Sequence, residues 1–374
     1  MKRLSLLFTA LVLPTLLLIE VRPNLRARQV PWPGHAQPFT LPEYLPGDCA
    51  YYRAAIVSML QDGDLDLRNN VNWQVLGPDT QVAVGARGEW YPKHPLGLSL
   101  AALPFYALLG DAGLLAFNLL QLLALEVLML LWARRFAGEG AALATLLAFA
   151  LGTLLRPAAF NFSPDVFSTL LVVGGAFALT SRRAALAGAL LGAAVAAKWT
   201  NLAFVPVAAI WAGAVLGQRA ALWLLGAAAP FLLALAALDA HMFGSPWITP
   251  YDHVGVGLLS GAARLEPSHR TRFDLPFWHG LWIQLTDAQG GLLRSAPVLL
   301  LAPPGLVLLW RRARSEAVLL CALSAVQLAV FAQYRDWSAS NFGHRFLLTV
   351  VALGAPPVAA LLSRALGESS PALV

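Results

Sequence analysis

The first candidate for chemistry is Asp48, an acidic residue directly before a short amphipathic helix predicted over residues 49–61. Apolar residues recur in this segment at helical spacing, and Gly63 follows as a stop signal. A carboxylate at a helix N-terminus can cap the free backbone amides. It can also act as a general base when an acceptor hydroxyl lies within hydrogen-bond reach. Both interpretations are open from the residues alone.

The second candidate is Lys93–His94, which lies between Pro92 and Pro95 at the entry to an apolar segment over residues 96–110. A proline disfavours helical backbone in the residue before it, so this stretch is predicted to be extended. A cation here would lie at the height of lipid headgroups, where it could bind a lipid phosphate. The alternative is an interfacial lysine whose stem lies in the membrane while its ammonium group reaches water.

Two more polar turns precede apolar segments. Asp165 follows Ser163 and Pro164, and either polar residue could be a plain helix cap. Arg345 begins an apolar segment from the predicted outer side, against the tendency of basic residues to remain in the cytoplasm. A guanidinium group can bind phosphate through two parallel hydrogen bonds. Arg345 is therefore a candidate for phosphate binding.

Two features indicate metal or disulfide chemistry only weakly. The segment 62–66 (DGDLD) resembles the start of a calcium loop but lacks the glycine and the final acid of an EF-hand. Cys49 and Cys321 lie far apart with no spacing motif. Neither a disulfide framework nor a thiolate metal site is therefore predicted.

These residues lie in a strongly apolar chain. Of its 374 residues, 58% are hydrophobic and only 12% are charged, whereas a soluble domain carries about 25% charged residues. This excludes an ordinary cytoplasmic enzyme, a disordered chain and a nucleic-acid-binding protein. The formal net charge of +6 is attributed to basic residues at the ends of membrane spans. We predict an all-α polytopic membrane protein with one integral membrane domain over residues 1–374.

About ten membrane spans are predicted, or eleven if residues 96–110 cross completely. A span requires about 20 apolar residues. Because the segment 96–110 is short and contains Pro104, we expect it to be a re-entrant or interfacial helix. The first apolar segment follows Lys2–Arg3 without a cleavage site, so we expect a retained anchor. The predicted spans cover residues 4–20, 113–132, 140–155, 163–180, 184–197, 200–216, 220–238, 296–310, 316–333 and 345–363.

The positions of lysine and arginine predict the orientation of these spans. With ten spans, every basic cluster lies on the cytoplasmic side. The two longest connecting segments, 21–95 and 239–295, then both lie outside. The clusters are Lys2–Arg3, Arg134–Arg135, Arg182–Arg183, Arg219, Arg311–Arg314 and Arg364.

The order of these motifs resembles the GT-C membrane glycosyltransferases, which include protein O-mannosyltransferases, aminoarabinose transferases and bacterial glycosyltransferase family 39. Asp48 matches the acid near the start of the first outer loop of that family. Lys93–Leu96 matches its Lys/His-Pro-Pro-Leu-like motif, and Asp165 matches the acid of its next outer turn. The glycine-rich segment 188–192 followed by Lys198, and Phe342–Arg345, resemble two further family segments.

The chain departs from the family pattern at two places. The acid often found directly before the motif lysine is Pro92 here, and Glu89 lies three residues earlier than Pro92. The familiar Asp-Glu pair of the first site is Asp48–Cys49, so the second carboxylate is missing. These departures leave the identity of the substrate and the use of a metal open.

The resemblance implies an inverting transfer of a sugar from a polyprenyl-phosphate donor, on the outer face of a prokaryotic inner membrane. The acceptor could be a lipid, a glycan or a protein, and no nucleic acid is expected. Asp48 would take the proton of the acceptor hydroxyl, and Asp165 would position the acceptor or the base. No cofactor is assigned, although a divalent metal is possible. The residues expected to bind substrate are Tyr51, Glu89, Lys93, His94 and Arg345.

The two outer segments would then divide the work: 21–95 would form the catalytic wall, and 239–295 would cover the site and select the acceptor. The main alternative is a lipid or sugar transporter. Transporters place polar features near the middle of the membrane, often in paired repeats, whereas here they gather on one predicted face. The other alternative is an inactive, glycosyltransferase-like membrane subunit, which the missing second acid keeps open.

Overall fold

The structure is a computed structural model of the chain. It describes residues 27–30, 39–42, 48–71, 79, 81–260, 262–267, 272–288, 290–337 and 344–368. The predicted first span over residues 4–20, and with it Lys2–Arg3, lies outside the described residues.

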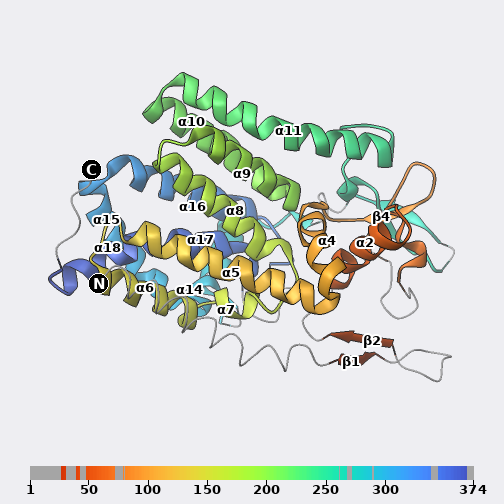
Figure 1. Cartoon of the computed structure of the whole chain (residues 1–374), viewed down its shortest axis with the longest axis horizontal. Helices are drawn as coiled ribbons and strands as arrows, with labels where there is room; N and C mark the ends of the chain where they lie inside the picture. Colours follow the sequence, from red (N-terminus) through yellow and green to blue (C-terminus); the bar gives the residue numbers. More distant parts are fainter. Residues whose placement is uncertain are drawn as a thin grey trace.

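Long helices run side by side along the longest axis of the molecule (Figure 1). Each of the nine predicted spans in the described part of the chain is helical. From α5 onward the helices are α5 (Asp111–Ala133), α6 (Glu139–Gly152), α7 (Leu155–Ala158), α8 (Pro164–Thr180), α9 (Ala184–Ala197), η2 (Trp199–Ala203), α10 (Phe204–Leu216), α11 (Gln218–Phe243), α13 (Phe277–Thr286), α14 (Leu292–Ser295), η4 (Pro297–Leu301), α15 (Ala302–Arg312), α16 (Arg314–Ala332), η5 (Arg345–Leu347), α17 (Leu348–Leu353) and α18 (Ala355–Ala365). Two of these, α13 and α14, lie in the predicted outer segment 239–295.

The predicted spans differ in length. Within the described residues, four helical segments are long and apolar enough to cross a membrane: Asp111–Ala133, Trp199–Leu216, Gln218–Phe243 and Arg314–Ala332. Arg345–Leu353 and Ala355–Ala365 qualify together as one span bent by 43°. Helices α6, α8 and α9 are apolar but have only 14 to 17 residues, which is about 21–26 Å against a hydrocarbon core of about 30 Å. The chain is an all-α polytopic membrane protein, as predicted, with several helices shorter than a full span.

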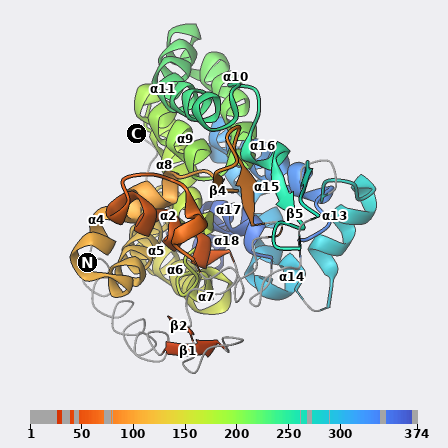
Figure 2. The ribbon, with the colours of Figure 1, turned by 90° about the vertical axis from the view of Figure 1, so that its right-hand side faces the viewer.

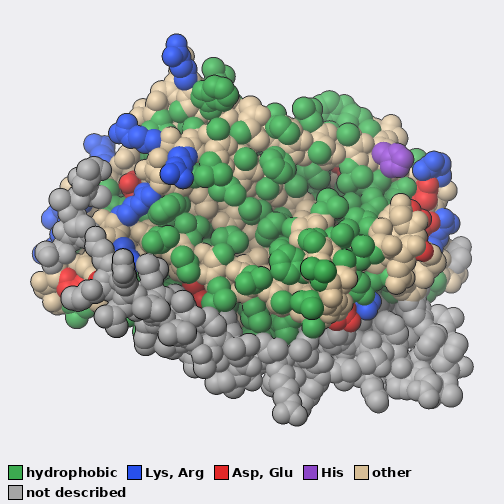
Figure 3. Space-filling view, viewed as in Figure 1, with side chains coloured by type: hydrophobic (Ala, Val, Ile, Leu, Met, Phe, Trp, Pro, Cys, Tyr) green, Lys and Arg blue, Asp and Glu red, His purple; other side chains and the backbone are tan. Residues whose placement is uncertain are grey.

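The two ends of the bundle differ in the charge of their side chains. Figure 3 shows hydrophobic side chains over the middle of the visible face and Lys and Arg side chains gathered at the end where α15 and α18 lie. At the C-terminal end of α5, the Arg135 guanidinium donates hydrogen bonds to the hydroxyls of Thr180 and Ser181, where α8 ends. The basic loops predicted to share one side therefore meet at one end of the bundle. Which side of the membrane this end faces remains a prediction.

The opposite end is covered by short elements from both predicted outer segments (Figure 2). From the first come α2 (Cys49–Gln61), η1 (Leu67–Asn69), β3 (Val82–Val84) and β4 (Trp90–Pro92), and from the second come η3 (Pro250–Asp252), β5 (Val254–Val256) and β6 (Arg264–Glu266). Helix α4 (Gly97–Leu109), in the segment predicted to be interfacial, directly follows the first. The strands form one antiparallel sheet in the order β4-β3-β5-β6, and Ala83 pairs with Val254. This sheet, which the sequence did not predict, joins the two outer segments. A separate antiparallel pair is formed by β1 (Ala27–Val30) and β2 (Phe39–Pro42).

Two helix boundaries near this end follow the sequence closely. Helix α2 covers the predicted residues 49–61, and Gly63 adopts φ 71°, a conformation that glycine adopts readily. Helix α4 contains Pro104 and is followed by Gly110 at φ 58°, after which α5 begins. The structure thus has a separate helix where a re-entrant or interfacial segment was expected. Its depth in a membrane remains a prediction.

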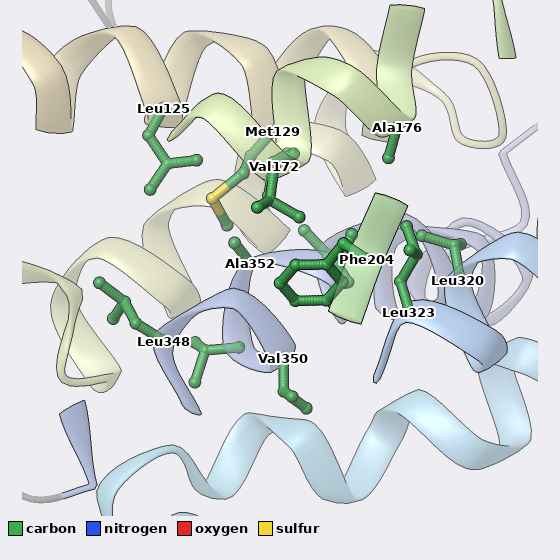
Figure 4. Close-up of a cluster of buried hydrophobic side chains, with 14 of the residues drawn as sticks. Leu125, Met129, Val172, Ala176, Phe204, Leu320, Leu323, Leu348, Val350 and Ala352 are labelled. Atoms are coloured by element: carbon green, nitrogen blue, oxygen red, sulfur yellow. The ribbon is translucent and has the colours of Figure 1, made fainter. Parts of the chain in front are cut away.

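The core of the bundle is built from large apolar side chains and from small residues that allow close approach of helices. Figure 4 shows Leu125 and Met129 of α5 near Val172 of α8 and Ala352 of α17, with Phe204 of α10 beside them. Elsewhere α9 packs directly against the backbone of α11. A Cβ atom on Gly188 would lie 2.0 Å from the carbonyl oxygen of Leu224.

This close approach predicts a position-specific effect of adding one methyl group. We expect Gly188→Ala to lower the free energy of unfolding by about 1–3 kcal/mol, because the backbone of α11 must move. Gly226→Ala on α11 is the matched control, since its Cβ would meet nothing within 4 Å. Thermal unfolding of the purified protein in detergent measures both variants. Equal midpoints would contradict the close packing of α9 on α11.

Candidate active site

Asp48 occupies the N-cap position of α2, but its side chain caps no backbone amide. One carboxylate oxygen, Oδ2, instead lies 3.5 Å from Nη2 of Arg345 and 3.8 Å from Nε2 of His94. The capping alternative therefore does not describe this side chain. Its position is set by α2 on one side and by the segment after β4 on the other.

Asp165 lies in the first turn of α8, behind Ser163 and Pro164. Its carboxylate accepts a 2.7 Å hydrogen bond from the Lys198 ammonium through Oδ1 and a 3.0 Å bond from the Ser163 hydroxyl through Oδ2. The side chain is 3% exposed, compared with 27% for Asp48. Asp165 is thus a buried carboxylate whose oxygens are occupied by protein donors.

Arg345 lies between the two carboxylates. Its Nε is 3.7 Å from Oδ2 of Asp165, while its Nη2 is 3.5 Å from Oδ2 of Asp48. These separations are within ion-pair range and longer than an ordinary hydrogen bond. The guanidinium also lies 5.0 Å from the ring centroid of Phe346, and the Lys198 ammonium lies 4.7 Å from the same centroid. The Phe346 ring therefore forms cation–π contacts with both Arg345 and Lys198.

His94 is held in one orientation by two tyrosines from different segments. Its ring stacks on Tyr52 of α2, with centroids 5.3 Å apart and planes inclined by 19°. Its Nδ1 lies 3.0 Å from the hydroxyl of Tyr251 in η3. Burial, and then the charge of Lys93, lower the pKa of His94 to about 3 against the opposing effect of Asp48. At neutral pH the ring is therefore uncharged.

This lowered pKa predicts how stability depends on pH. The unfolded chain binds a proton at His94 below pH 6.5, whereas the folded chain does so only near pH 3, so His94 removes stability as the pH falls between these values. From pH 6.5 to pH 5 the loss is about 2 kcal/mol. We expect His94→Gln to lack this pH-dependent loss of stability. Its midpoint of thermal unfolding should therefore fall less than that of wild type between pH 6.5 and pH 5. His279→Gln, at an exposed histidine of α13, should behave like wild type. Parallel curves for wild type and His94→Gln would contradict the neutral, buried state of His94.

Lys93 and Tyr51 lie near Asp48, and Glu89 lies farther along the sheet. Lys93 is half-buried; burial lowers the pKa of its ammonium group, while the charge of Asp48 opposes that shift. Tyr51 is a buried residue in the first turn of α2, and burial, then Asp48, raise the pKa of its hydroxyl. Glu89 forms a 2.8 Å ion pair with Arg87 in the turn between β3 and β4. The structure thus gathers the predicted residues around Asp48, with the exception of Glu89.

The electrostatic balance of this cluster favours an ionised Asp48. Burial raises the pKa of its carboxyl, but Lys93, Arg345, a hydrogen bond from the Gln81 side chain, and His94 when it is protonated, hold it below its ordinary value of 3.8. Two carboxylates, Asp48 and Asp165, face three cations, Lys93, Lys198 and Arg345, around a neutral imidazole. The cluster therefore carries a net charge of +1, which suits an anionic ligand.

Cys49, where the family pattern has a second acid, lies beside this cluster, within electrostatic range of Arg345 and both carboxylates. Its thiol is fully buried and donates to the side-chain oxygen of Asn161 at 3.2 Å. Burial raises the pKa of the thiol, so a thiolate is not formed at neutral pH. Among the described residues, no group of three or more His, Cys, Asp or Glu side chains could hold a metal ion. The carboxylates of the segment 62–66 accept hydrogen bonds from other side chains: Asp62 from Asn70, Asp64 from Ser58 and Asp66 from Arg68.

Sequence reasoning did not assign three residues of this site. Lys198 was noted only as the end of a glycine-rich segment, although a lone lysine at an outer turn runs against the positive-inside tendency and could have identified it. Ser163 was interpreted as a possible cap. Tyr251 gave no signal, because its contact with His94 joins segments 157 residues apart.

Solved structures of two glycosyltransferases share this fold. The crystal structure of ArnT from Cupriavidus metallidurans bound to undecaprenyl phosphate matches with a TM-score of 0.60 at 14% identity, over 97% of this chain and 60% of that chain. The archaeal oligosaccharyltransferase AglB from Archaeoglobus fulgidus, in complex with an inhibitory peptide and a dolichol-phosphate, matches with a TM-score of 0.55 at 14% identity, over 96% and 50%. No known sequence family and no curated protein matches the chain. The chain therefore has the GT-C fold and spans one half to three fifths of the length of these two proteins.

Proposed function

We propose that this protein is a GT-C glycosyltransferase that moves a sugar from a polyprenyl-phosphate donor to an acceptor hydroxyl. Two independent observations support the proposal. The fold is that of ArnT and AglB, whose structures were solved with undecaprenyl phosphate and dolichol-phosphate. The charge cluster around Asp48 lies at the end of the bundle opposite the basic loops, where we propose that the outer face of the inner membrane lies.

The observation that carries the proposal is the unequal occupancy of the two carboxylates that flank Arg345. Asp165 is buried and accepts hydrogen bonds from Lys198 and Ser163. Asp48 is more exposed. Among the described residues, its carboxylate lies 3.5 Å from Arg345 and 3.8 Å from His94, and it also accepts a hydrogen bond from the Gln81 side chain. A general base must be ionised and able to accept a new hydrogen bond. Asp48 meets both requirements, and Asp165 serves to hold Lys198 and Arg345 in place.

The cations would bind the phosphate of the donor and of the product. In the reaction the acceptor oxygen bonds to the anomeric carbon, the bond from that carbon to the phosphate oxygen breaks, and Asp48 takes the hydroxyl proton. A single displacement inverts the anomeric configuration and leaves polyprenyl phosphate with one more negative charge. Arg345, Lys93 and Lys198 would stabilise this developing charge, because fixed cations act strongly in a site with little water.

The neutral His94 ring has a positioning role in this scheme. Its Nε2 faces Asp48, and its Nδ1 contacts Tyr251. Since Tyr251 belongs to the segment 239–295, this contact supports the proposal that the segment covers the site and takes part in acceptor selection. We also keep Tyr51 and Glu89 as proposed substrate contacts; Glu89 would act at the edge of the site, where it pairs with Arg87.

Binding of polyprenyl phosphate to wild type and Lys93→Ala tests the proposed phosphate site. Removal of a half-buried cation that binds phosphate should weaken the complex by about 10- to 100-fold, because a charged hydrogen bond contributes about 1.5–3 kcal/mol. Arg87→Ala, at an exposed arginine of the same outer segment, should bind like wild type. Unchanged affinity in Lys93→Ala, measured by titration in detergent, would remove Lys93 from the phosphate site.

A further inference from the structure

A concave region lies beside the charge cluster. Its volume is about 1070 Å³, at the upper end of the range for small-molecule pockets. Its walls come from α2, the β3–β4 turn, α4, α8, α9 and α11. Along α11 the lining extends from Phe231 to His241, a distance of about 15 Å at 1.5 Å per residue. The cavity is therefore long enough for an extended hydrocarbon chain.

A backbone contact separates this cavity from the charge cluster. A Cβ on Gly97, at the start of α4, would lie 2.4 Å from the carbonyl oxygen of Ala196 near the end of α9. Leu96 and Ala196 line the cavity, whereas His94 and Lys198, two residues away in each segment, belong to the cluster. Neither carboxylate of the cluster nor Arg345 lines the cavity. The cavity and the charge cluster are thus separated by the contact between Gly97 and Ala196, and the two carboxylates and Arg345 of the cluster do not line the cavity.

The cavity changes in character along its length. Its apolar part is lined by side chains of α4, α8 and α11, including Leu100, Phe167 and Leu235; Leu235 is buried, whereas Leu100 is 55% exposed. Its rim is polar and contains Asp64, Asp66, Arg87 and Glu89. An apolar chamber with a polar rim fits an amphiphile whose chain lies inside and whose head lies at the rim.

The charge of the rim is opposite to that of the cluster. Glu89 pairs with Arg87 at 2.8 Å, and Asp66 pairs with Arg68, which lies just outside the lining. Asp64 accepts hydrogen bonds from the Ser58 hydroxyl and the Asp66 amide, and no ion pair is formed by it within the described residues. The four rim residues therefore sum to a charge of −2, or −1 when the neighbouring Arg68 is counted, and they offer several acceptors for hydroxyl groups. A phosphate head would be repelled there, whereas it would be attracted by the cluster.

We propose that this cavity binds a lipid with a long apolar chain and an uncharged, hydroxyl-rich head. The site is distinct from the phosphate site of the proposed donor. A lipid with hydroxyl groups in this cavity, which the contact between Gly97 and Ala196 separates from the charge cluster, is a candidate acceptor. The acceptor role rests on the proposed function. The binding itself does not depend on transfer.

Photolabelling of the full chain in phosphatidylcholine nanodiscs tests the proposal. The probes are a dodecyl glucoside and a dodecyl phosphate that carry the same diazirine in the alkyl chain, and labelled peptides are identified by mass spectrometry. The glucoside should label residues 96–101 and 231–241, and the phosphate should label them at least several-fold less. Asp64→Asn should lower the ratio of glucoside labelling to phosphate labelling by about two- to five-fold, as expected for one partly exposed charge.

Two tryptophan substitutions fill the cavity, and a third is a matched control. Ala234→Trp on α11 and Ala101→Trp on α4 place a bulky ring among the lining residues, and both should reduce labelling by the glucoside about tenfold or more. Ala237→Trp, at an exposed alanine of α11 outside the lining, should label like wild type. Unchanged labelling in both cavity variants, or equal labelling by the phosphate probe, would overturn the proposal. Asp48→Asn should be labelled like wild type, because labelling measures binding of the lipid and not transfer of a sugar. Absence of transfer activity would therefore leave the proposed lipid binding intact.

Discussion

Asp48→Asn will reduce sugar transfer by about 10²–10⁴-fold while binding of polyprenyl phosphate remains close to that of wild type. The substitution preserves the shape of the side chain and removes the ability to take a proton. Positioned proton transfer contributes a rate factor of this size, equivalent to roughly 3–5 kcal/mol of barrier. Binding should persist because Lys93, Lys198 and Arg345 are unchanged. The measurement is the rate of donor consumption at saturating acceptor.

Asp62→Asn is the matched control for this prediction. Asp62 ends the same helix that Asp48 begins, and it accepts a hydrogen bond from the Asn70 side chain, which an asparagine oxygen can also accept. The control should transfer sugar at the wild-type rate. A rate for Asp48→Asn within about threefold of wild type would show that another group removes the proton.

Lys198→Met will lower the free energy of unfolding by about 3 kcal/mol. The 2.7 Å pair between Lys198 and Asp165 is buried, with side chains 14% and 3% exposed. Removing one partner of a buried pair leaves the other charge without compensation and is strongly destabilising. Here Arg345 remains 3.7 Å from Asp165, so we expect the lower end of the usual range. The midpoint of thermal unfolding in detergent reports the effect.

A double variant separates loss of the charge pair from loss of packing. Asp165→Asn combined with Lys198→Met removes both charges and should recover most of the lost stability. Arg68→Met removes the partner of Asp66 from an exposed pair and should cost less than about 1 kcal/mol. If the double variant is no more stable than Lys198→Met alone, the buried ion pair is not what stabilises this region.

The sequence predicted the helices well because their determinants are local. Apolar length located the helices of the nine predicted spans in the described part of the chain, and the pair Asp48 and Gly63 bounded α2 to the residue. Hydropathy did not distinguish a helix that spans the whole membrane from a short helix such as α9, which is apolar over only 14 residues. The bend at Gly354 between α17 and α18 was likewise not predicted.

The candidate site was predicted residue by residue, but its geometry was not. Asp48, Lys93, His94, Asp165 and Arg345 were each identified from residue type and position. Their contacts join segments separated by up to 297 positions, since Asp48 meets Arg345, and no local pattern specifies such a meeting. The sheet that joins residues 82–92 to 254–266 escaped prediction for a related reason. Its strands have three residues each, too few for a recognisable alternation.

The unequal roles of the two acids also required the structure. From the sequence, Asp48 and Asp165 were both assigned to catalysis. The contacts of Asp165 with Lys198, Ser163 and Arg345 support the proposal that it holds these cations in place. We propose Asp48, which is more exposed than Asp165, as the group that receives the proton.

Release of free polyprenyl phosphate from a panel of polyprenyl-phosphate sugars tests the central claim most directly. Purified wild type and Asp48→Asn would be assayed together, with membrane extract as the source of acceptors. The account predicts release by wild type from at least one donor and almost none by Asp48→Asn. Absence of release from every donor, with both proteins folded and bound to polyprenyl phosphate, would contradict a transferase and favour a transporter or an inactive membrane subunit.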